Sequence, residues 1–265
     1  MTRGGVAVSV GGMVRRLAVL SLCAALLPGL SMAQRLPGAR SLSDTPWGYA
    51  IVASPTRAGA ESQRFELRAG DCGANNGGDD CTRDRERTEF RPDFEWTPGQ
   101  EIWFGFSVLL PQGFPVSDQV NTTLAQIHQR GGPERRAGGR VSHPPVMQIE
   151  ARGDWLSVTV HVPDAPNIHR NLMRLAAMRG GWHDLAIGFD NREPRLTIWI
   201  DGQERAVVTG WAAPLPDIYY LKYGLYRSFV SRHGGPMATQ IAWFDEVRVG
   251  PTRQSVRVDA SNPVD

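Results

Sequence analysis

The sequence predicts an all-β fold, a two-sheet sandwich or jelly roll, and three observations support this prediction. Apolar and polar residues alternate with a period of two through most of the chain from residue 44 onward. Turn-forming residues separate the alternating stretches, in a chain that contains 29 glycines and 19 prolines. No segment shows a convincing amphipathic helix. With 265 residues and 41% hydrophobic content, the chain is long enough for one sizeable core.

Each strand of the predicted sandwich corresponds to a short alternating stretch. The expected strands, in chain order, are residues 47–53, 64–69, 85–91, 101–110, 123–129, 146–152, 155–162, 182–189, 195–201, 205–210, 220–226 and 240–250. Asp201 and Gly202 form a typical hairpin turn between two of them. Residues 171–180 are compatible with either a short helix or a strand.

The N-terminal segment has the features of a secretory signal peptide. Arg15 and Arg16 precede an apolar run of about 14 residues, and small residues follow it up to Ala33. The run is too short to cross a bilayer comfortably, since that takes about 20 residues. We therefore expect a signal peptide at residues 1–33 and one domain at residues 34–265. The domain is expected to be a soluble, periplasmic or secreted monomer that is not bound to a membrane.

Charge and cysteine content narrow the possible classes of partner. The chain has 29 basic and 27 acidic residues; removing residues 1–33 takes away three arginines, so the domain is close to neutral. A neutral domain gives no reason to expect nucleic acid or a membrane surface as partner. Cys72 and Cys81 lie close together in an exported chain, which favours a disulfide, with a zinc pair as the weaker interpretation.

Three of the predicted strands each carry an unusual set of polar side chains on one face. Residues two apart in a strand share a face, and here the shared faces hold Arg87, Glu89 and Arg91; Gln126 and His128; and Tyr220, Lys222 and Tyr226. The opposite faces are mainly apolar, as a core requires. Half-exposed strands often alternate in this way, but these particular groups are able to orient an anion and transfer a proton. Lys222 is the only lysine in the chain.

The same three strands carry a family resemblance. The segments "RTEFR", "QIH" and "YLKYGLY" resemble, in that order, the signature strands of jelly-roll alginate lyases. The later text, with "RLTIWIDGQ" and "WFDEVRVG", is similar to the related group that contains heparin lyase I and the glucuronan lyases. The resemblance covers about residues 85–250. It implies a concanavalin A-like sandwich whose concave sheet forms the substrate groove. The chain departs from the usual motifs at Phe90, Leu221, Tyr223 and Arg227.

The resemblance implies a reaction, β-elimination on an acidic polysaccharide. A base removes the proton next to the uronate carboxylate, and the glycosidic oxygen leaves. It further implies that Tyr226 transfers the proton, with His128 as the alternative base. Arg87 and Gln126 would neutralise the carboxylate, since preorganised donors stabilise the developing charge.

Further residues are expected to contact the substrate. Lys222 is placed to bind the carboxylate of the next sugar, and Glu89 to hold the geometry of its flanking arginines. Arg91 is either a substrate ligand or a structural one, and Tyr220 lies on the same face. Arg227 is a candidate determinant of which polymer binds. The sequence does not distinguish alginate, glucuronan and a heparin-like glycosaminoglycan as the substrate.

Several alternatives remain beside this interpretation. A non-catalytic carbohydrate-binding protein would use the same sheet face without a proton-transfer pair. The carboxylate pattern of a retaining glycoside hydrolase and the G-x-S-x-G motif of a serine hydrolase are absent from the sequence. No cofactor is required, although the oxygen-rich segment at residues 75–80 could bind calcium. The glycine- and arginine-rich segment at residues 129–145 is either a solvated loop or a basic lid over an acidic ligand.

Overall fold

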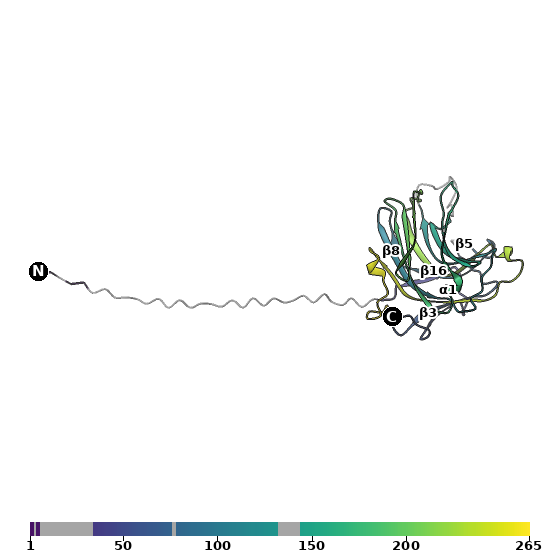
Figure 1. The fold of residues 1–265 in the computed structure, drawn as a ribbon, viewed down its shortest axis with the longest axis horizontal. Helices are drawn as coiled ribbons and strands as arrows, with labels where there is room; N and C mark the ends of the chain where they lie inside the picture. Colours follow the sequence, from purple (N-terminus) through teal and green to yellow (C-terminus); the bar gives the residue numbers. More distant parts are fainter. Residues whose placement is uncertain (3, 6–33, 76–77, 132–143) are drawn as a thin grey trace. The chain divides into compact units, whose positions relative to one another are not determined.

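The computed structural model describes residues 1–2, 4–5, 34–75, 78–131 and 144–265, and every structural statement below concerns these residues (Figure 1). The chain divides into two units, Met1–Ser31 and Met32–Asp265, and the folded domain is the second. The predicted signal peptide lies almost entirely outside the described residues. None of the described helices is long and apolar enough to span a membrane.

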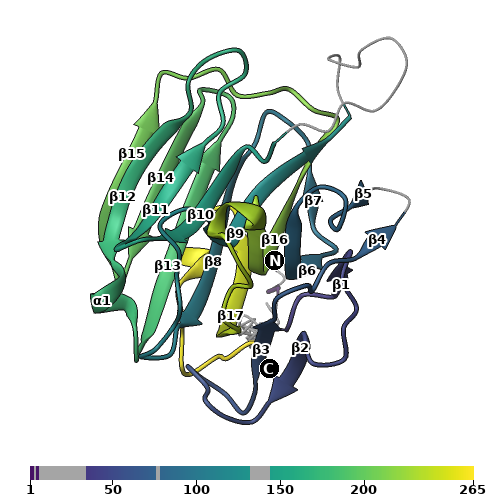
Figure 2. The ribbon, with the colours of Figure 1, turned by 90° about the vertical axis from the view of Figure 1, so that its right-hand side faces the viewer.

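The domain consists of two antiparallel sheets. The first, called here the polar sheet, has the order β1 (Gly38–Ser41), β6 (Arg85–Pro92), β16 (Ile218–Ser228), β9 (Asn121–Arg130), β10 (Met147–Arg152), β11 (Trp155–Val160) and β12 (Ile168–Arg174), with β7 (Glu95–Trp96) paired to β16. The second, called the back sheet, has the order β15 (Gln203–Thr209), β14 (Arg195–Ile200), β13 (Trp182–Asp190), β8 (Glu101–Leu109), β17 (Gln240–Gly250), β3 (Ser62–Leu67) and β2 (Tyr49–Val52). Figure 2 shows β9 and β16 side by side in the polar sheet.

The remaining elements are short. β4 (Ala74–Asn75) and β5 (Gly78–Asp79) form a small hairpin, and the helical turns are α1 (Leu175–Met178), η1 (Val230–His233) and η2 (Gln254–Val256). The predicted all-β sandwich is therefore confirmed, and all twelve predicted strands are present. Residues 171–180, which the sequence left open, hold both structures: β12 ends at Arg174 and α1 follows it.

The core lies between the two sheets and follows the period of two. On β16 the alternate residues Tyr219, Leu221, Tyr223 and Leu225 are almost completely buried. The ring of Tyr223 is surrounded by aromatic side chains from both sheets, namely Phe65, Phe90, Phe104 and Phe244. Because this side of β16 is fixed in the core, the intervening residues must face the other way, out of the polar sheet.

Candidate active site

The polar residues singled out in the sequence come together because β6, β16 and β9 are neighbours in the polar sheet. β16 lies between the other two strands, although it follows β9 by about 90 residues in the chain. The register places Tyr226 opposite Arg87 of β6, and Lys222 and Tyr220 opposite Gln126 and His128 of β9. The three expected polar faces thus form one continuous face, which we call the candidate active site.

Gly224 allows the central strand to fit at this position. Its φ angle is 132°, and a Cβ atom there would lie 2.4 Å from the carbonyl oxygen of Thr88 and 2.9 Å from the Cα of Glu89. Any side chain would therefore push β16 away from β6. The register of β16 against β9 also shifts between Tyr223 and Tyr226. This irregularity re-aims Tyr226 relative to β9, as bulges near active sites commonly do.

A chain of charged and amide groups fixes the floor of the site. The guanidinium of Arg87 donates from Nε and Nη2 to the two carboxylate oxygens of Asp80, at 2.6 and 2.9 Å, and from Nη1 to Glu89 at 2.9 Å. The other oxygen of Glu89 accepts a hydrogen bond from Nε2 of Gln126. Each of these four side chains is less than 10% exposed. The carboxylates of Glu89 and Asp80 raise the pKa of Arg87 against the effect of its burial, so that it is permanently charged.

The expected contact of Arg87 with the substrate carboxylate stays a prediction, and in this structure its Nε and Nη2 groups are bonded to Asp80. The guanidinium lies against the ring of Tyr226, with its carbon 4.1 Å from the ring centre. The role of Glu89 as a holder of arginine geometry agrees with its contact with Arg87.

Tyr226 is the most available proton-transfer group of the site. Its side chain is half-buried, and its hydroxyl has no hydrogen-bond partner among the described residues. The phenol oxygen is therefore not committed to a structural contact. The positively charged guanidinium of Arg87 lies over the ring of Tyr226.

Lys222 is a buried cation without an acceptor. It is 7% exposed, and within the described part of the chain no oxygen accepts a hydrogen bond from its ammonium. Burial lowers the pKa of Lys222 to about 8; Glu89 opposes this effect, and Arg87 and Arg91 add to it. The nitrogen of Lys222 keeps contact with solvent and lies 5.9 Å from the ring centre of Tyr220, so a bound anion would be a further partner for it. The amide oxygen of Gln126, on the facing strand, is fully buried without a partner.

His128 stacks on Tyr220 beside this cation. The ring centres are 5.2 Å apart and nearly parallel. Nδ1 of His128 lies 2.9 Å from the backbone nitrogen of Gln129 and 3.1 Å from its carbonyl oxygen, so the backbone of Gln129 holds this side of the ring. Burial, with Lys222 next in effect, lowers the pKa of His128 to about 3. Burial also raises the pKa of Tyr220.

Arg91 lies over the ring of Tyr220 and is the last polar residue of the candidate active site on β6. Its guanidinium carbon is 4.6 Å from the ring centre of Tyr220. It forms an ion pair with Glu95, which also accepts hydrogen bonds from Arg130. The side chain of Arg91 is paired with Glu95 but is still partly exposed, so its position is compatible with both a structural role and a substrate-binding role.

Arg227 lies on the opposite side of β16 from the other candidates. It follows Tyr226 and faces the core, where it is completely buried. Its guanidinium pairs with Glu86 at 2.8 Å and donates to Gln240 at 2.9 Å and to the backbone oxygen of Ala238. These contacts give Arg227 a structural role, and its assignment as a determinant of the polymer stays a prediction.

The cysteine-containing loop supplies a residue that sequence reasoning missed. The predicted disulfide is present, with Cys72 and Cys81 bonded and their Cα atoms 5.1 Å apart. Asp80, next to Cys81, is the carboxylate that holds Arg87. The only hint in the sequence was the density of acidic residues beside the cysteine, which we interpreted as a possible calcium site.

The predicted calcium segment is only partly described, because residues 76–77 lie outside the described residues. Of its two carboxylates, Asp79 accepts hydrogen bonds from the backbone of Cys81 and Thr82, and Asp80 is bonded to Arg87. Among the described residues there is no group of three or more His, Cys, Asp or Glu side chains with metal-binding geometry. Most of the predicted basic lid, residues 132–143, also lies outside the described residues.

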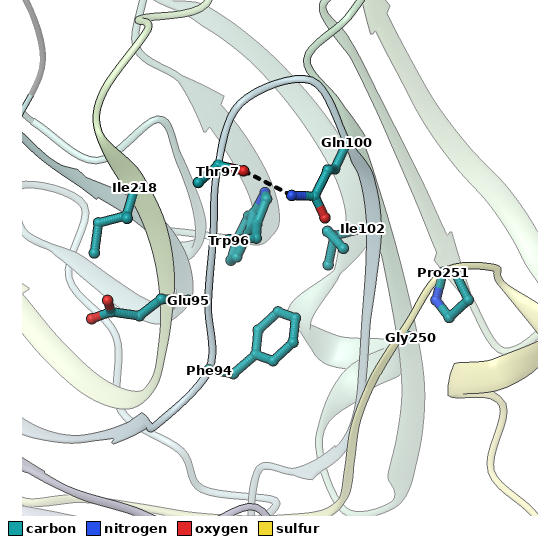
Figure 3. Close-up of a pocket in the computed structure, with 9 residues that line it drawn as sticks. All are labelled: Phe94, Glu95, Trp96, Thr97, Gln100, Ile102, Ile218, Gly250 and Pro251. Carbon is teal, nitrogen blue, oxygen red and sulfur yellow. Dashed lines mark hydrogen bonds between the residues drawn. The ribbon is translucent and has the colours of Figure 1, made fainter.

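A separate pocket of about 410 Å³ opens beside the end of the site. It is mainly apolar and contains none of the proton-transfer candidates. Figure 3 shows the rings of Phe94 and Trp96 within it. Glu95, which lies between Phe94 and Trp96 in the chain, forms an ion pair with Arg91 and so links the pocket to the candidate active site. The lining residues are Phe94, Glu95, Trp96, Thr97, Gln100, Ile102, Ile218, Gly250 and Pro251.

Solved structures of other proteins share this two-sheet sandwich. The domain is similar to an endo-β-1,4-glucuronan lyase from the fungus Trichoderma reesei, with a TM-score of 0.59 and 19% identity over 82% of this chain and 97% of that one. It is also similar to alginate lyase A1-II′, a member of polysaccharide lyase family 7, with a TM-score of 0.55 and 15% identity over 78% and 84% of the two chains. A third similar structure is the family 7 alginate lyase AlyA1 from Zobellia galactanivorans, with a TM-score of 0.52 and 14% identity over 73% and 78%.

The chain belongs to the polysaccharide lyase family, whose family model matches residues 31–248. The protein is therefore a lyase, and the resemblance found in the sequence is confirmed. A search of curated proteins finds no match. At identities below 20% the solved structures establish the fold, and the substrate must be argued from the site itself.

Proposed function

We propose that the protein cleaves a polysaccharide containing uronic acid by β-elimination, as an exported monomer that needs no cofactor. The observation that supports this most directly is that one strand face carries both a phenol without a hydrogen-bond partner, Tyr226, and an ammonium without a hydrogen-bond acceptor, Lys222, among the described residues. A carboxylated sugar would supply the anion that Lys222 lacks. It would also place a ring proton within the same row of side chains as Tyr226.

The chemistry follows from these groups. Lys222 neutralises the uronate carboxylate of the sugar that is cleaved, and not that of the next sugar as the sequence suggested, while the ring of His128 contacts the same carboxylate. The neutralised carboxylate makes the neighbouring C–H bond more acidic. Tyr226, as the phenolate, takes that proton; the electron pair forms the new C=C bond as the C–O bond to the leaving sugar breaks. The same phenol then protonates the leaving oxygen and returns to the phenolate. Throughout, the charge of Arg87 stands against the ring of Tyr226.

Two contacts favour Tyr226 as the base over His128. The ring of His128 is stacked on Tyr220, and its Nδ1 is within hydrogen-bond distance of both the nitrogen and the carbonyl oxygen of Gln129. The hydroxyl of Tyr226 has no hydrogen-bond partner among the described residues. We therefore assign His128 to the carboxylate, and Tyr226 to both proton transfers.

The test is to offer the full-length protein alginate, polyglucuronate, heparin and hyaluronan, and to follow the ultraviolet absorbance of the unsaturated uronate product. We expect cleavage of at least one polymer, reduced by about 10²- to 10⁴-fold in Tyr226→Phe. Tyr49→Phe, which removes a hydroxyl from the back sheet, is the matched control and should behave as wild type. Binding of a polymer without any product would instead favour a carbohydrate-binding protein.

Export is part of the proposal and has its own test. A disulfide between Cys72 and Cys81 is typical of proteins that fold in an oxidising compartment. We expect the protein recovered from the producing cells to be cleaved near Ala33 and to lie in the periplasm or the medium. N-terminal sequencing of the recovered protein checks this, and a mature chain that retains residues 1–33 would contradict it.

A further inference from the structure

Asp80 is a buried carboxylate, and among the described residues its side chain is hydrogen-bonded to Arg87. It is 2% exposed, and its two oxygens accept hydrogen bonds from Nε and Nη2 of Arg87 at 2.6 and 2.9 Å. This two-pronged contact fixes both the position and the plane of the guanidinium. It leaves Nη1 to reach Glu89 on the same strand.

Asp80 is itself held by the loop that the disulfide closes. Its backbone N–H donates to the carbonyl of Gly73 at 3.0 Å, and its carbonyl accepts from Arg85 at 2.9 Å. The disulfide joins Cys72 to Cys81, the residues directly adjacent to Gly73 and Asp80. The disulfide and the hydrogen bond between Asp80 and Gly73 therefore hold together the same two ends of the loop.

We propose that Asp80 is a positioning residue for Arg87, held in place by the Cys72–Cys81 disulfide, so that catalysis depends on the oxidised state of this loop. The inference rests on the proposed function, in which Arg87 stands against the phenolate of Tyr226. Without Asp80, only Glu89 restrains the guanidinium, and the charge is no longer fixed against the ring. Displacements of about 1 Å at a catalytic group are able to lower rates by about 10²-fold.

The first experiment measures kcat and KM separately. Asp80→Asn keeps the size of the side chain but removes its charge, and we expect kcat to fall by about 10²-fold with KM little changed, because Lys222 and His128 remain. Asp93→Asn removes an exposed carboxylate just beyond the end of β6 and should leave both constants unchanged. In the double variant with Arg87→Lys, the loss should be smaller than the product of the two single losses, because both act through one contact.

The second experiment changes the disulfide without changing any charge. A phosphine reductant gives its electron pair to the disulfide and becomes a phosphine oxide, while water supplies the oxygen atom of the oxide and the protons of the two thiols. We expect kcat to fall as it does for Asp80→Asn and to return on reoxidation. The reductant should have no effect on Cys72→Ser/Cys81→Ser, which should already show the lowered kcat.

The third experiment observes Arg87 directly and does not depend on activity. The Nε–H of Arg87, assigned by its loss in Arg87→Lys, should exchange slowly with water in an NMR spectrum of the wild type. Reduction or Asp80→Asn should make it exchange rapidly, whereas Asp93→Asn should not.

The inference is overturned if folded Asp80→Asn or reduced wild type keeps both the kcat and the slow Nε–H exchange of the oxidised protein. If the wild type cleaves none of the polymers, the proposed function fails; the exchange measurement then still decides whether Asp80 and the disulfide position Arg87.

Discussion

Replacing Lys222 with methionine should make the protein more stable and less active. The pKa of Lys222 is lowered from 10.5 to about 8, chiefly by burial. This difference corresponds to about 3 kcal/mol by which folding disfavours the charged ammonium at pH 7. Methionine has a similar shape and no charge, so Lys222→Met should recover most of that free energy. For a domain of this size the gain corresponds to an increase in Tm of about 6–12 °C.

The lowered pKa of Lys222 determines how the stability difference between the variant and the wild type changes with pH. Between pH 8 and 10.5 the unfolded chain binds the proton of Lys222 and the folded protein does not, so the stability of the wild type rises with pH in this range. The advantage of Lys222→Met should therefore be fully present below pH 8 and disappear towards pH 10.5. Cleavage of the polymer should be impaired at every pH, because the variant lacks the cation that we propose binds the carboxylate.

Thermal unfolding monitored by circular dichroism at several pH values measures the effect. Arg130→Met is the matched control: the Arg130 side chain is 52% exposed, so its replacement should change Tm only slightly. A Lys222→Met protein that is less stable than the wild type at pH 7 would refute the reasoning. That result would mean that the ammonium finds a favourable partner in the folded state.

Three further predictions follow from the same structure. Gly224→Ala should destabilise the domain by about 2 kcal/mol or more, measured by urea unfolding, because its Cβ would meet the Thr88 carbonyl at 2.4 Å; a neutral effect would show that β6 and β16 separate easily. Arg227→Met should lower the free energy of unfolding by about 3–5 kcal/mol by leaving Glu86 buried without its cation, with the KM of the folded protein unchanged; a raised KM with normal stability would support its assignment to substrate. The pKa of His128 is lowered from 6.5 to about 3, so its neutral form favours the folded state, and the stability that this shift contributes is lost as pH falls below 6.5. His128→Gln should therefore reduce the acid sensitivity of unfolding, and kcat/KM of the wild type should show no ionisation of His128 between pH 5 and 8; a step that disappears in His128→Gln would contradict this.

Much of the candidate site was accessible from the sequence because strands have a fixed period. Alternation placed Tyr220, Lys222 and Tyr226 on one face of a strand and Leu221 and Tyr223 on the other, and the structure agrees. The order of the three motifs could not reveal that β16 lies between β6 and β9. That adjacency depends on long-range pairing, which no local pattern encodes.

Two arginines show what residue type alone leaves undetermined. The sequence-based roles of Arg227 and Arg87 were assigned by residue type, because an arginine in a lyase motif suggests contact with an acidic substrate. Their actual partners, Glu86 and Asp80, come from the packing of distant side chains and from a disulfide-closed loop. A guanidinium binds any well-placed carboxylate, so only the folded structure determines which one it meets.

By itself, the sequence determined the all-β class, the strand positions, the disulfide and the set of residues able to transfer a proton or bind an anion. These are local properties, set by the two-residue repeat, turn-forming residues and side-chain chemistry. Only the tertiary structure decided which of those groups remain available. It committed Arg87 to Asp80 and buried Arg227, while leaving Tyr226 without a hydrogen-bond partner among the described residues and Lys222 without an acceptor there. Availability depends on what the other side chains already bind, and that is settled only when distant segments of the chain pack together.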